Sequence, residues 1–132
     1  MADMYGVTQL TSTAKALAEP TRVRILASLL RGELCVCELC DALAVTQSTL
    51  STHLQVIRLA GLVATRKEGK WMYYALTPEA AAFLKATFAH FTRSLQADAA
   101  LRQDRLRLEK RLALRTAGTC CVGFENKKCC GK

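Results

Sequence analysis

The sequence predicts a mainly α-helical domain with one β-hairpin. Apolar residues recur at helical spacing over most of the chain, and two short strand-like stretches flank Glu68 and Gly69. Gly and Pro are scarce, at 7 and 2 of 132 residues, and hydrophobic residues make up 51%. This composition excludes collagen-like chains, low-complexity chains and a wholly disordered basic chain. The length is that of one domain.

The expected helices of the N-terminal part follow from spacing and from capping residues. Leu10, Ala14 and Leu17 recur at helical spacing and predict a first amphipathic helix. A second helix begins at Pro20, which suits the first helical position, and stops near Gly32. These signals are local, so they fix where helices start and end better than how the helices pack.

A further helix and a hairpin follow. A short segment over 38–43 precedes a helix that Thr46 caps and Gly61 ends. The period then changes, and Leu62–Lys67 and Lys70–Leu76 predict the two strands of a β-hairpin. The apolar positions of the capped helix are Leu50, Leu54 and Ile57.

The C-terminal part is helical in pattern but changes phase. Thr77 and Pro78 are a strong helix start, and the apolar phase shifts near 97–100. An unbroken helix from Pro78 to Arg115 would be about 55 Å long, which is too long to bury against one small domain. We therefore expect a break, a partner subunit, or both. The stripe before the shift is Leu84, Phe88, Phe91 and Leu95, and after it Leu101, Arg105, Leu108 and Leu112.

Charge and element order together indicate DNA binding. Lys plus Arg number 19 against 11 Asp plus Glu, a net charge of +8, which favours a polyanionic partner. Aromatic residues are only 6%, which argues against a base-stacking single-strand binder. The element order is that of a winged helix-turn-helix, with the helix from Thr46 to Ala60 as recognition helix and the hairpin as wing. The alternative is a solvated Ser/Thr-rich face beside a basic turn. The residues assigned to base edges and phosphates are Gln47, Ser48, Ser51, Thr52, Gln55, Arg58, Arg66, Lys67 and Lys70.

Three of the seven cysteines stand directly before this motif. We find neither a signal peptide nor a membrane-spanning stretch and expect a cytoplasmic protein, where clustered cysteines are more often ligands than disulfides. Cys35, Cys37 and Cys40 would supply three thiolates, which suit a soft ion. In a helix, Cys35 and Cys37 would point about 200° apart. If all three bind one ion, Cys35 must lie before the helix or the first turn must distort.

Other interpretations of the cysteines stay open. The three could be small buried hydrophobes, and Cys37 with Cys40 forms a C-x-x-C that could be a redox centre. Zinc would need a fourth ligand. A polar tail carries four more cysteines, which could bind a second metalloid, pass one inward or be the true sensor. The tail cysteines are Cys120, Cys121, Cys129 and Cys130.

Four segments together resemble the ArsR/SmtB family of metalloregulatory repressors, in particular its arsenic-responsive ArsR branch. The segments are Arg22-Val-Arg-Ile-Leu, Glu33-Leu-Cys-Val-Cys-Glu-Leu-Cys, Gln47-Ser-Thr-Leu-Ser-Thr-His-Leu and Arg66-Lys-Glu-Gly-Lys-Trp-Met-Tyr-Tyr. The resemblance covers roughly Leu10 to Phe91. It implies a homodimer, formed by the N- and C-terminal helices, that leaves the operator of a resistance operon when trivalent arsenic or antimony binds. The Cys-rich tail departs from the family pattern.

The expected organisation has three parts. Residues 1–96 form the winged helix-turn-helix DNA-binding and dimerisation domain, 97–118 a charged C-terminal helical extension, and 119–132 a flexible Cys-rich tail. A two-fold dimer favours double-stranded operator DNA with an inverted repeat.

The leading hypothesis is a repressor of an arsenic-resistance operon with As(III) or Sb(III) as inducer. The alternatives are a repressor that senses cadmium, lead or zinc, a thiol redox switch, and a metalloid-sequestering protein that acts through its tail. We see no Ser/His/Asp set, phosphate loop or carboxylate pair arranged for catalysis and expect no enzyme. The ligands could come from one chain or two.

Overall fold

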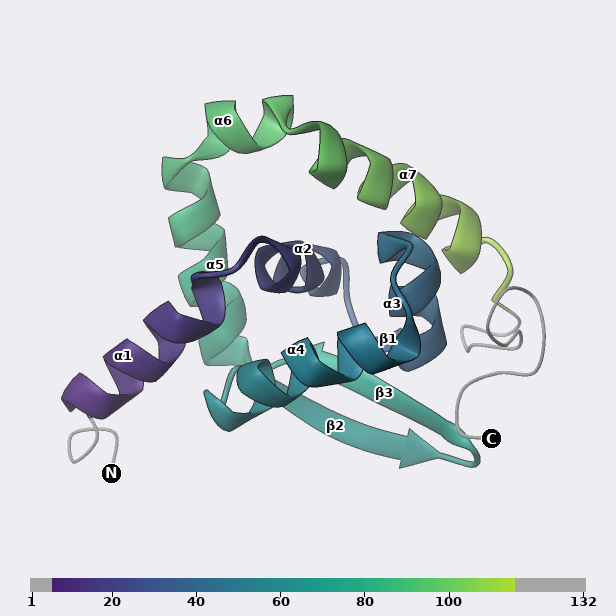
Figure 1. The fold of residues 1–132 in the computed structure, drawn as a ribbon, viewed down its shortest axis with the longest axis horizontal. Helices are drawn as coiled ribbons and strands as arrows, with labels where there is room; N and C mark the ends of the chain where they lie inside the picture. The colour runs from purple at the N-terminus through teal and green to yellow at the C-terminus, as the bar shows by residue number, and fades with distance from the viewer. Residues whose placement is uncertain (1–5, 116–132) are drawn as a thin grey trace.

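The computed structural model describes residues 6–115, which form a mainly helical fold with one small sheet (Figure 1). The order of elements confirms the expected winged helix-turn-helix, in which α3 and α4 are the helix-turn-helix and β2 and β3 the wing. The described elements are α1 (Gly6–Leu17), α2 (Pro20–Leu29), β1 (Leu34–Cys35), α3 (Val36–Leu43), α4 (Gln47–Leu59), β2 (Val63–Glu68), β3 (Trp71–Leu76), α5 (Pro78–His90), α6 (Thr92–Ala97) and α7 (Ala99–Leu112).

Local capping explains where the helices begin and end. The Thr46 hydroxyl accepts a hydrogen bond from the Thr49 N–H at 3.2 Å and caps α4, as the sequence predicts. Thr77 caps α5 in the same way through the Ala80 N–H at 3.1 Å. Ala44 adopts a left-handed backbone, with φ of 57°, and so ends α3. The tight turn that follows fixes α4 against α3.

The sheet is antiparallel, with strand order β1-β3-β2. Gly69 has a φ of 62° in the turn of the hairpin, a backbone conformation that favours glycine. β1 is a strand that the sequence pattern does not predict, because two residues are too short to show alternation. It pairs with β3 through Leu34 opposite Tyr74 and Cys35 opposite Tyr73. The segment that carries the first cysteine is therefore part of the wing sheet.

One continuous core joins α2, α3, α4, α5, α7 and the sheet. The predicted inward face of α4 is buried along its whole length. The most deeply buried apolar side chains are Ile25, Leu26, Leu34, Leu39, Leu43, Leu50, Ile57, Tyr73, Leu84 and Leu108.

The chain after Thr77 breaks into three helices, as its length requires. The breaks fall at Phe91 and at Asp98. The backbone of Asp98 is extended, with φ of −72° and ψ of 122°. Asp98 also caps α7 by accepting the Leu101 N–H at 2.9 Å. In Figure 1, α5, α6 and α7 form an arc around α2 that brings α7 back onto α3. No helix over residues 6–115 is long and apolar enough to cross a membrane.

Candidate DNA interface and cysteine site

The outer face of α4 is polar and exposed. Its buried face turns toward the core, which leaves the opposite side free for other contacts. The Thr52 hydroxyl donates to the Ser48 carbonyl at 3.1 Å, so part of this face is held by the helix itself. Arg58, a predicted phosphate contact, is exposed on this helix, and so are all the predicted base-reading residues: Gln47, Ser48, Ser51, Thr52 and Gln55.

The polar face and the wing border one hollow. Ser51, Gln55 and Arg58 line it from α4, together with Leu59, and Tyr74 lines it from β3. Its volume is about 450 Å³. The geometry thus brings part of the predicted recognition surface next to the wing sheet.

The predicted phosphate contacts of the wing differ from one another. Arg66 forms a two-point ion pair with Glu33, at 2.7 and 2.9 Å, and a further one with Glu68, while its guanidinium lies 4.6 Å from the centre of the Tyr73 ring. The hydrogen bonds that Arg66 donates to Glu33 and Glu68 raise its pKa above the usual value. Contact with a phosphate would require Arg66 to leave these partners. The exposed side chains of Lys67 and Lys70 stand nearer the tip of the hairpin.

His53 on α4 faces the protein rather than solvent. Its Nδ1 lies 3.2 Å from the Arg22 guanidinium and 3.9 Å from the Glu19 carboxylate. The side chain is only 17% exposed. The structure therefore places His53 in packing between α2 and α4.

Cys35 and Cys37 stand side by side at the start of α3. Cys35 is the last residue of β1 and precedes the helix, which is one of the two arrangements that shared coordination allows. Its Sγ lies 3.3 Å from the Sγ of Cys37. Two sulfurs bound to one ion at about 2.3 Å stand roughly 3.3–3.8 Å apart, so this pair already has a suitable spacing. Cys37 and Cys40 are reduced, whereas Cys35 is disulfide-bonded, so a site of three thiolates needs a reducing medium.

Cys40 is not assembled with the other two sulfurs. Over residues 6–115, no group of three or more His, Cys, Asp or Glu side chains is arranged to hold a metal ion. Burial, with the charge of Asp41, raises the pKa of the Cys40 thiol to about 11, and Arg111 acts in the opposite direction. A three-sulfur site would therefore require α3 to rearrange. The other candidate ligands, Cys120, Cys121, Cys129 and Cys130, lie outside the described residues.

The cysteine segment is surrounded by charged groups, and the sequence did not predict that they pair with arginines of the C-terminal part. Glu38 is fully buried, and its Oε1 accepts the Cys35 N–H at 2.8 Å. Both Glu38 oxygens accept hydrogen bonds from Arg115 at 2.7 Å. Arg111, only 4% exposed, pairs with Asp41 and donates to the Cys37 Sγ at 3.4 Å.

One sequence signal could have revealed this contact. Arg107, Arg111 and Arg115 follow one another at intervals of four and therefore share one face of a helical segment. A row of arginines on one face needs acceptors, and all three find them on or beside α3. The acceptors themselves are some 65 to 77 residues away, so spacing alone could not identify them.

Comparison with known proteins explains the shared architecture. Residues 19–65 match the arsR family of bacterial regulatory proteins. The chain is 49% identical over 65 residues to the arsenical resistance operon repressor of Escherichia coli (strain K12), which covers 48% of this chain and 56% of that protein. HlyU from Vibrio cholerae N16961 is 36% identical, with a TM-score of 0.61 over 66% of this chain and 96% of its own. The chain belongs to the arsR family.

A further arsR-type structure agrees with this assignment. The homodimeric winged helix-turn-helix DNA-binding domain from Mycobacterium bovis is 27% identical, with a TM-score of 0.65, and covers 74% of this chain and 92% of its own. The region that matches the arsR family model contains α2, α3, α4 and all three cysteines of the first cluster. It does not contain α7. The chain spans 52 to 57% of the length of three arsenic-resistance regulators that it matches.

Proposed function

We propose that this arsR-family protein is a DNA-binding transcriptional repressor of an arsenic-resistance operon. It acts by binding rather than by catalysis, as a homodimer on double-stranded operator DNA in the cytoplasm. Trivalent arsenic or antimony bound by cysteine thiolates releases it from the operator. The names of its relatives support the arsenic assignment, and the position of the cysteines supports the mechanism.

The observation that carries this proposal is the placement of the close sulfur pair. Cys35 belongs to β1 and so to the wing sheet, whereas Cys37 belongs to α3, which packs on α4. Their sulfurs are 3.3 Å apart. An ion that pulls on this pair therefore acts on the wing and on the recognition helix at once. A coupling of about 1–3 kcal/mol would lower DNA affinity roughly 5- to 150-fold.

The inducer chemistry requires only ligand exchange. Each thiol that binds arsenous acid replaces one hydroxyl and releases one water, with no change of oxidation state. We propose Cys35 and Cys37 as the first two ligands and Cys40 as the third. Because Cys40 is not yet in place, its recruitment supplies the rearrangement of α3 that DNA release needs. We keep the tail cysteines Cys120, Cys121, Cys129 and Cys130 as a second or alternative site.

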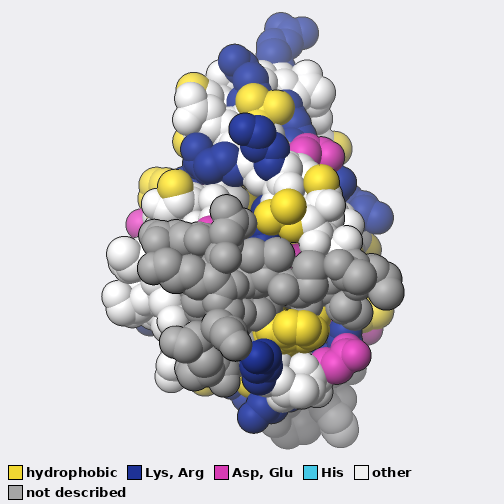
Figure 2. Space-filling model, turned by 90° about the vertical axis from the view of Figure 1, so that its right-hand side faces the viewer, with side chains coloured by type: hydrophobic (Ala, Val, Ile, Leu, Met, Phe, Trp, Pro, Cys, Tyr) yellow, Lys and Arg dark blue, Asp and Glu magenta, His cyan; other side chains and the backbone are white. Residues whose placement is uncertain are grey.

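DNA recognition would use α4 and the wing. Gln47 and Ser51 carry hydrogen-bonding groups on the exposed face of α4, which suit base edges in the major groove. Lys67 and Lys70 carry exposed charges near the tip of the wing, where they suit phosphates. In Figure 2, Lys and Arg side chains appear at the lower end of the molecule, on the side of the wing, and also at the upper end, on the side of α7.

The dimer would use apolar surface that one chain leaves uncovered. Leu10 on α1 is 66% exposed, and Phe83 and Phe91, from α5 and its end, are 39% and 52% exposed. In Figure 1, α1 projects from the body on the side of α5. A two-fold pairing there would place two α4 helices about 34 Å apart, which favours an inverted repeat. Within the organisation we propose, 1–96 binds DNA and dimerises, 97–118 is a charged extension and 119–132 a Cys-rich tail.

Fluorescence anisotropy tests the proposal directly. The full chain, kept reduced with a phosphine, is titrated against a labelled duplex that the protein itself has selected from a random pool. Arsenite or antimonite should weaken binding at least about fivefold. The triple variant Cys35/Cys37/Cys40→Ser should still bind the duplex but lose this response. A variant with Cys120, Cys121, Cys129 and Cys130 changed to Ser is the matched control and should keep it.

The same assay separates the proposed contacts. Gln47→Ala and Ser51→Ala should weaken binding to the selected duplex more than to unrelated DNA, whereas Lys67→Ala and Lys70→Ala should weaken both and flatten the salt dependence. Lys85→Ala, on α5, is the charge control. Unchanged affinity with arsenite and antimonite would refute the inducer, and loss of the response in the tail variant would move the site to the tail.

A further inference from the structure

Helix α7 lies on the segment that contains the proposed thiol site. Arg111 donates to the Cys37 sulfur and pairs with Asp41. Arg115 holds Glu38, whose carboxylate in turn accepts the Cys35 N–H. Both cysteines are therefore bonded, directly or through one carboxylate, to arginines that lie outside the residues matching the arsR family model.

The attachment of α7 is mostly ionic. Asp104, 2% exposed, accepts hydrogen bonds from Arg24 at 2.7 and 2.8 Å and from Arg107 at 2.9 Å. Leu108 is the only apolar side chain of α7 that is fully buried. Buried ion pairs add little net stability, because desolvation offsets their attraction. Helix α7 is therefore docked specifically but held weakly for its length.

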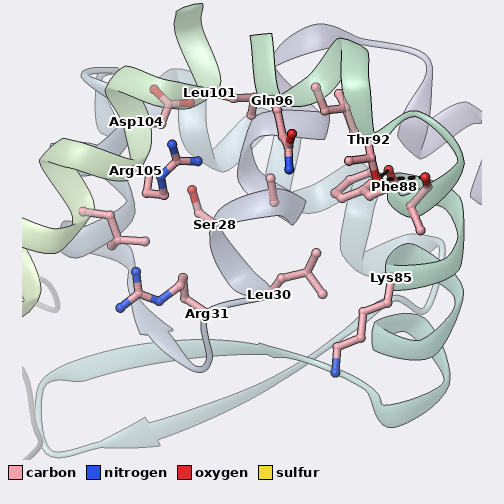
Figure 3. Close-up of a pocket in the computed structure, with 14 residues that line it drawn as sticks. Ser28, Leu30, Arg31, Lys85, Phe88, Thr92, Gln96, Leu101, Asp104 and Arg105 are labelled. Carbon is pink, nitrogen blue, oxygen red and sulfur yellow. Dashed lines mark hydrogen bonds between the residues drawn. The ribbon is translucent and has the colours of Figure 1, made fainter. Parts of the chain in front are cut away.

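A hollow beneath α7 points the same way. A pocket of about 390 Å³ separates the first half of α7 from α5 and α2 (Figure 3). Phe88 of α5 and Leu101 of α7 line it together with the aliphatic part of Lys85. The first half of α7 thus lacks dense packing, and the second half is fixed by its arginines. Asp98, with its extended backbone, gives a point about which the helix can turn.

The docked helix conflicts with metalloid binding. The Cys37 sulfur accepts a hydrogen bond from Arg111 through a lone pair, and an arsenic atom would need a sulfur lone pair to bind. Cys37 is also fully buried, so the sulfur pair has no open approach. Moving Cys40 toward the pair would shift α3, to which Arg111 and Arg107 are attached through Asp41 and the Ala42 carbonyl.

We infer that Arg111 and Arg115 are positioning residues that hold the cysteine segment in its inducer-free form, so that docking of α7 and coordination of the metalloid exclude each other. This inference rests on the proposed function, because it assumes that the inducer binds at Cys35 and Cys37. The effect is reciprocal by thermodynamic linkage. If docking of α7 lowers the affinity for the inducer by a given factor, the bound inducer lowers the equilibrium constant for α7 docking by the same factor.

Arsenite binding by calorimetry tests the inference in the reduced full chain. Arg111→Ala and Arg115→Ala should bind arsenite roughly 5- to 100-fold more tightly than the wild type. Arg111→Lys keeps the charge beside Asp41 but not the planar guanidinium. Its arsenite affinity should lie between those of the wild type and Arg111→Ala. Arg105→Ala removes the same charge from an exposed residue of α7 that lines the hollow beneath the helix, and should change affinity less than about twofold. A purely structural role would weaken binding instead.

Hydrogen exchange gives the reciprocal measurement. Saturating arsenite should raise the exchange rates of amides over 99–112 in the wild type. The Arg111→Ala substitution should raise the same rates without arsenite. Unchanged or weaker arsenite affinity in Arg111→Ala, together with unchanged exchange over 99–112, would overturn the inference while leaving the repressor function intact.

A ligand-free arm keeps the inference testable if the wild type binds no arsenite, which would refute the inducer itself. Alkylation of Cys37 by iodoacetamide, followed by mass spectrometry, should then be several-fold faster in Arg111→Ala than in Arg105→Ala. Equal rates in the two variants would show that α7 does not cover the thiol and would reject the inference.

Discussion

The winged helix-turn-helix and helix α7 are held in place by different forces. The inner face of α4 is entirely apolar, and Leu50, Leu54 and Ile57 are buried in one core. Helix α7 buries Asp104 and Arg111 beside a single leucine. Apolar burial is non-directional and favourable over its whole area, whereas a buried ion pair depends on each partner.

This difference predicts separate stabilities within one chain. The apolar region should open only when the whole domain unfolds, and α7 should open locally at a lower free energy. This arrangement suits the proposed function, because the part that would move need not be as stable as the part proposed to bind DNA. Substitutions in the apolar region should therefore change the free energy of global unfolding, whereas substitutions in α7 should mainly change hydrogen exchange over 99–112.

Truncation in the apolar region should have the largest effect. Leu54 is 2% exposed, and Leu54→Ala should lower the free energy of unfolding by about 2–5 kcal/mol through lost burial and a cavity. Urea denaturation followed by circular dichroism measures it. Leu59→Ala, on the same helix and 78% exposed, is the matched control and should cost far less. Similar losses in both variants would contradict the packing described for α4.

Removing the buried charge of α7 should rank second. Asp104→Asn leaves Arg24 and Arg107 without their carboxylate, and the hydrogen bonds to Asp104 are the main cause of the raised pKa of Arg24. Because Arg24 is partly exposed, we expect about 1–3 kcal/mol rather than the larger cost of a fully buried pair. The loss should appear as faster exchange over 99–112, with a smaller change in global unfolding. If the free energies from exchange over 99–112 and from global unfolding changed equally, α7 would not open separately from the rest of the domain.

Alkaline pH should destabilise α3, which carries Cys40 and contacts both α4 and α7. The pKa of Cys40 is raised from 9.0 to about 11, first by burial and then by Asp41. The unfolded thiol loses its proton first, so stability is complete below about pH 9 and falls as pH rises toward 11. We expect a loss of about 1 kcal/mol between pH 8 and pH 10, relative to Cys40→Ala, in urea titrations. Parallel pH profiles of the two proteins would contradict this burial.

The same contrast explains what the sequence could predict. The start of α4 at Thr46 and of α5 at Thr77 was predictable, because a cap and its N–H lie three residues apart. The position of Cys35 before α3 was one of the two arrangements that the geometry of shared coordination allowed. The exposed face from Gln47 to Arg58 followed from helical period. All of these signals lie within a few turns of the chain.

The remaining features depend on contacts between distant residues. β1 exists only because Cys35 pairs with Tyr73, and two residues carry no pattern of their own. The bond from Arg111 to Cys37 joins residues 74 positions apart, and the burial of Glu38 depends on Arg115. The sequence indicated a charged extension but not that its arginines would end on the cysteine segment.

The smallest effect should come from the surface pair of α7, and it decides what holds this helix. Arg31 and Glu109 form an ion pair whose side chains are 42% and 53% exposed, so Glu109→Gln should cost less than about 0.5 kcal/mol in exchange over 99–112. Glu109 and Asp104 carry the same charge on the same helix and differ chiefly in burial. If Glu109→Gln and Asp104→Asn opened α7 equally, docking would follow the net charge of the helix, and 0.5 M salt would release it in both proteins. A response confined to Asp104→Asn would instead show that the buried contacts between α7 and the rest of the domain hold it, which is the condition under which binding at the cysteines can control this helix.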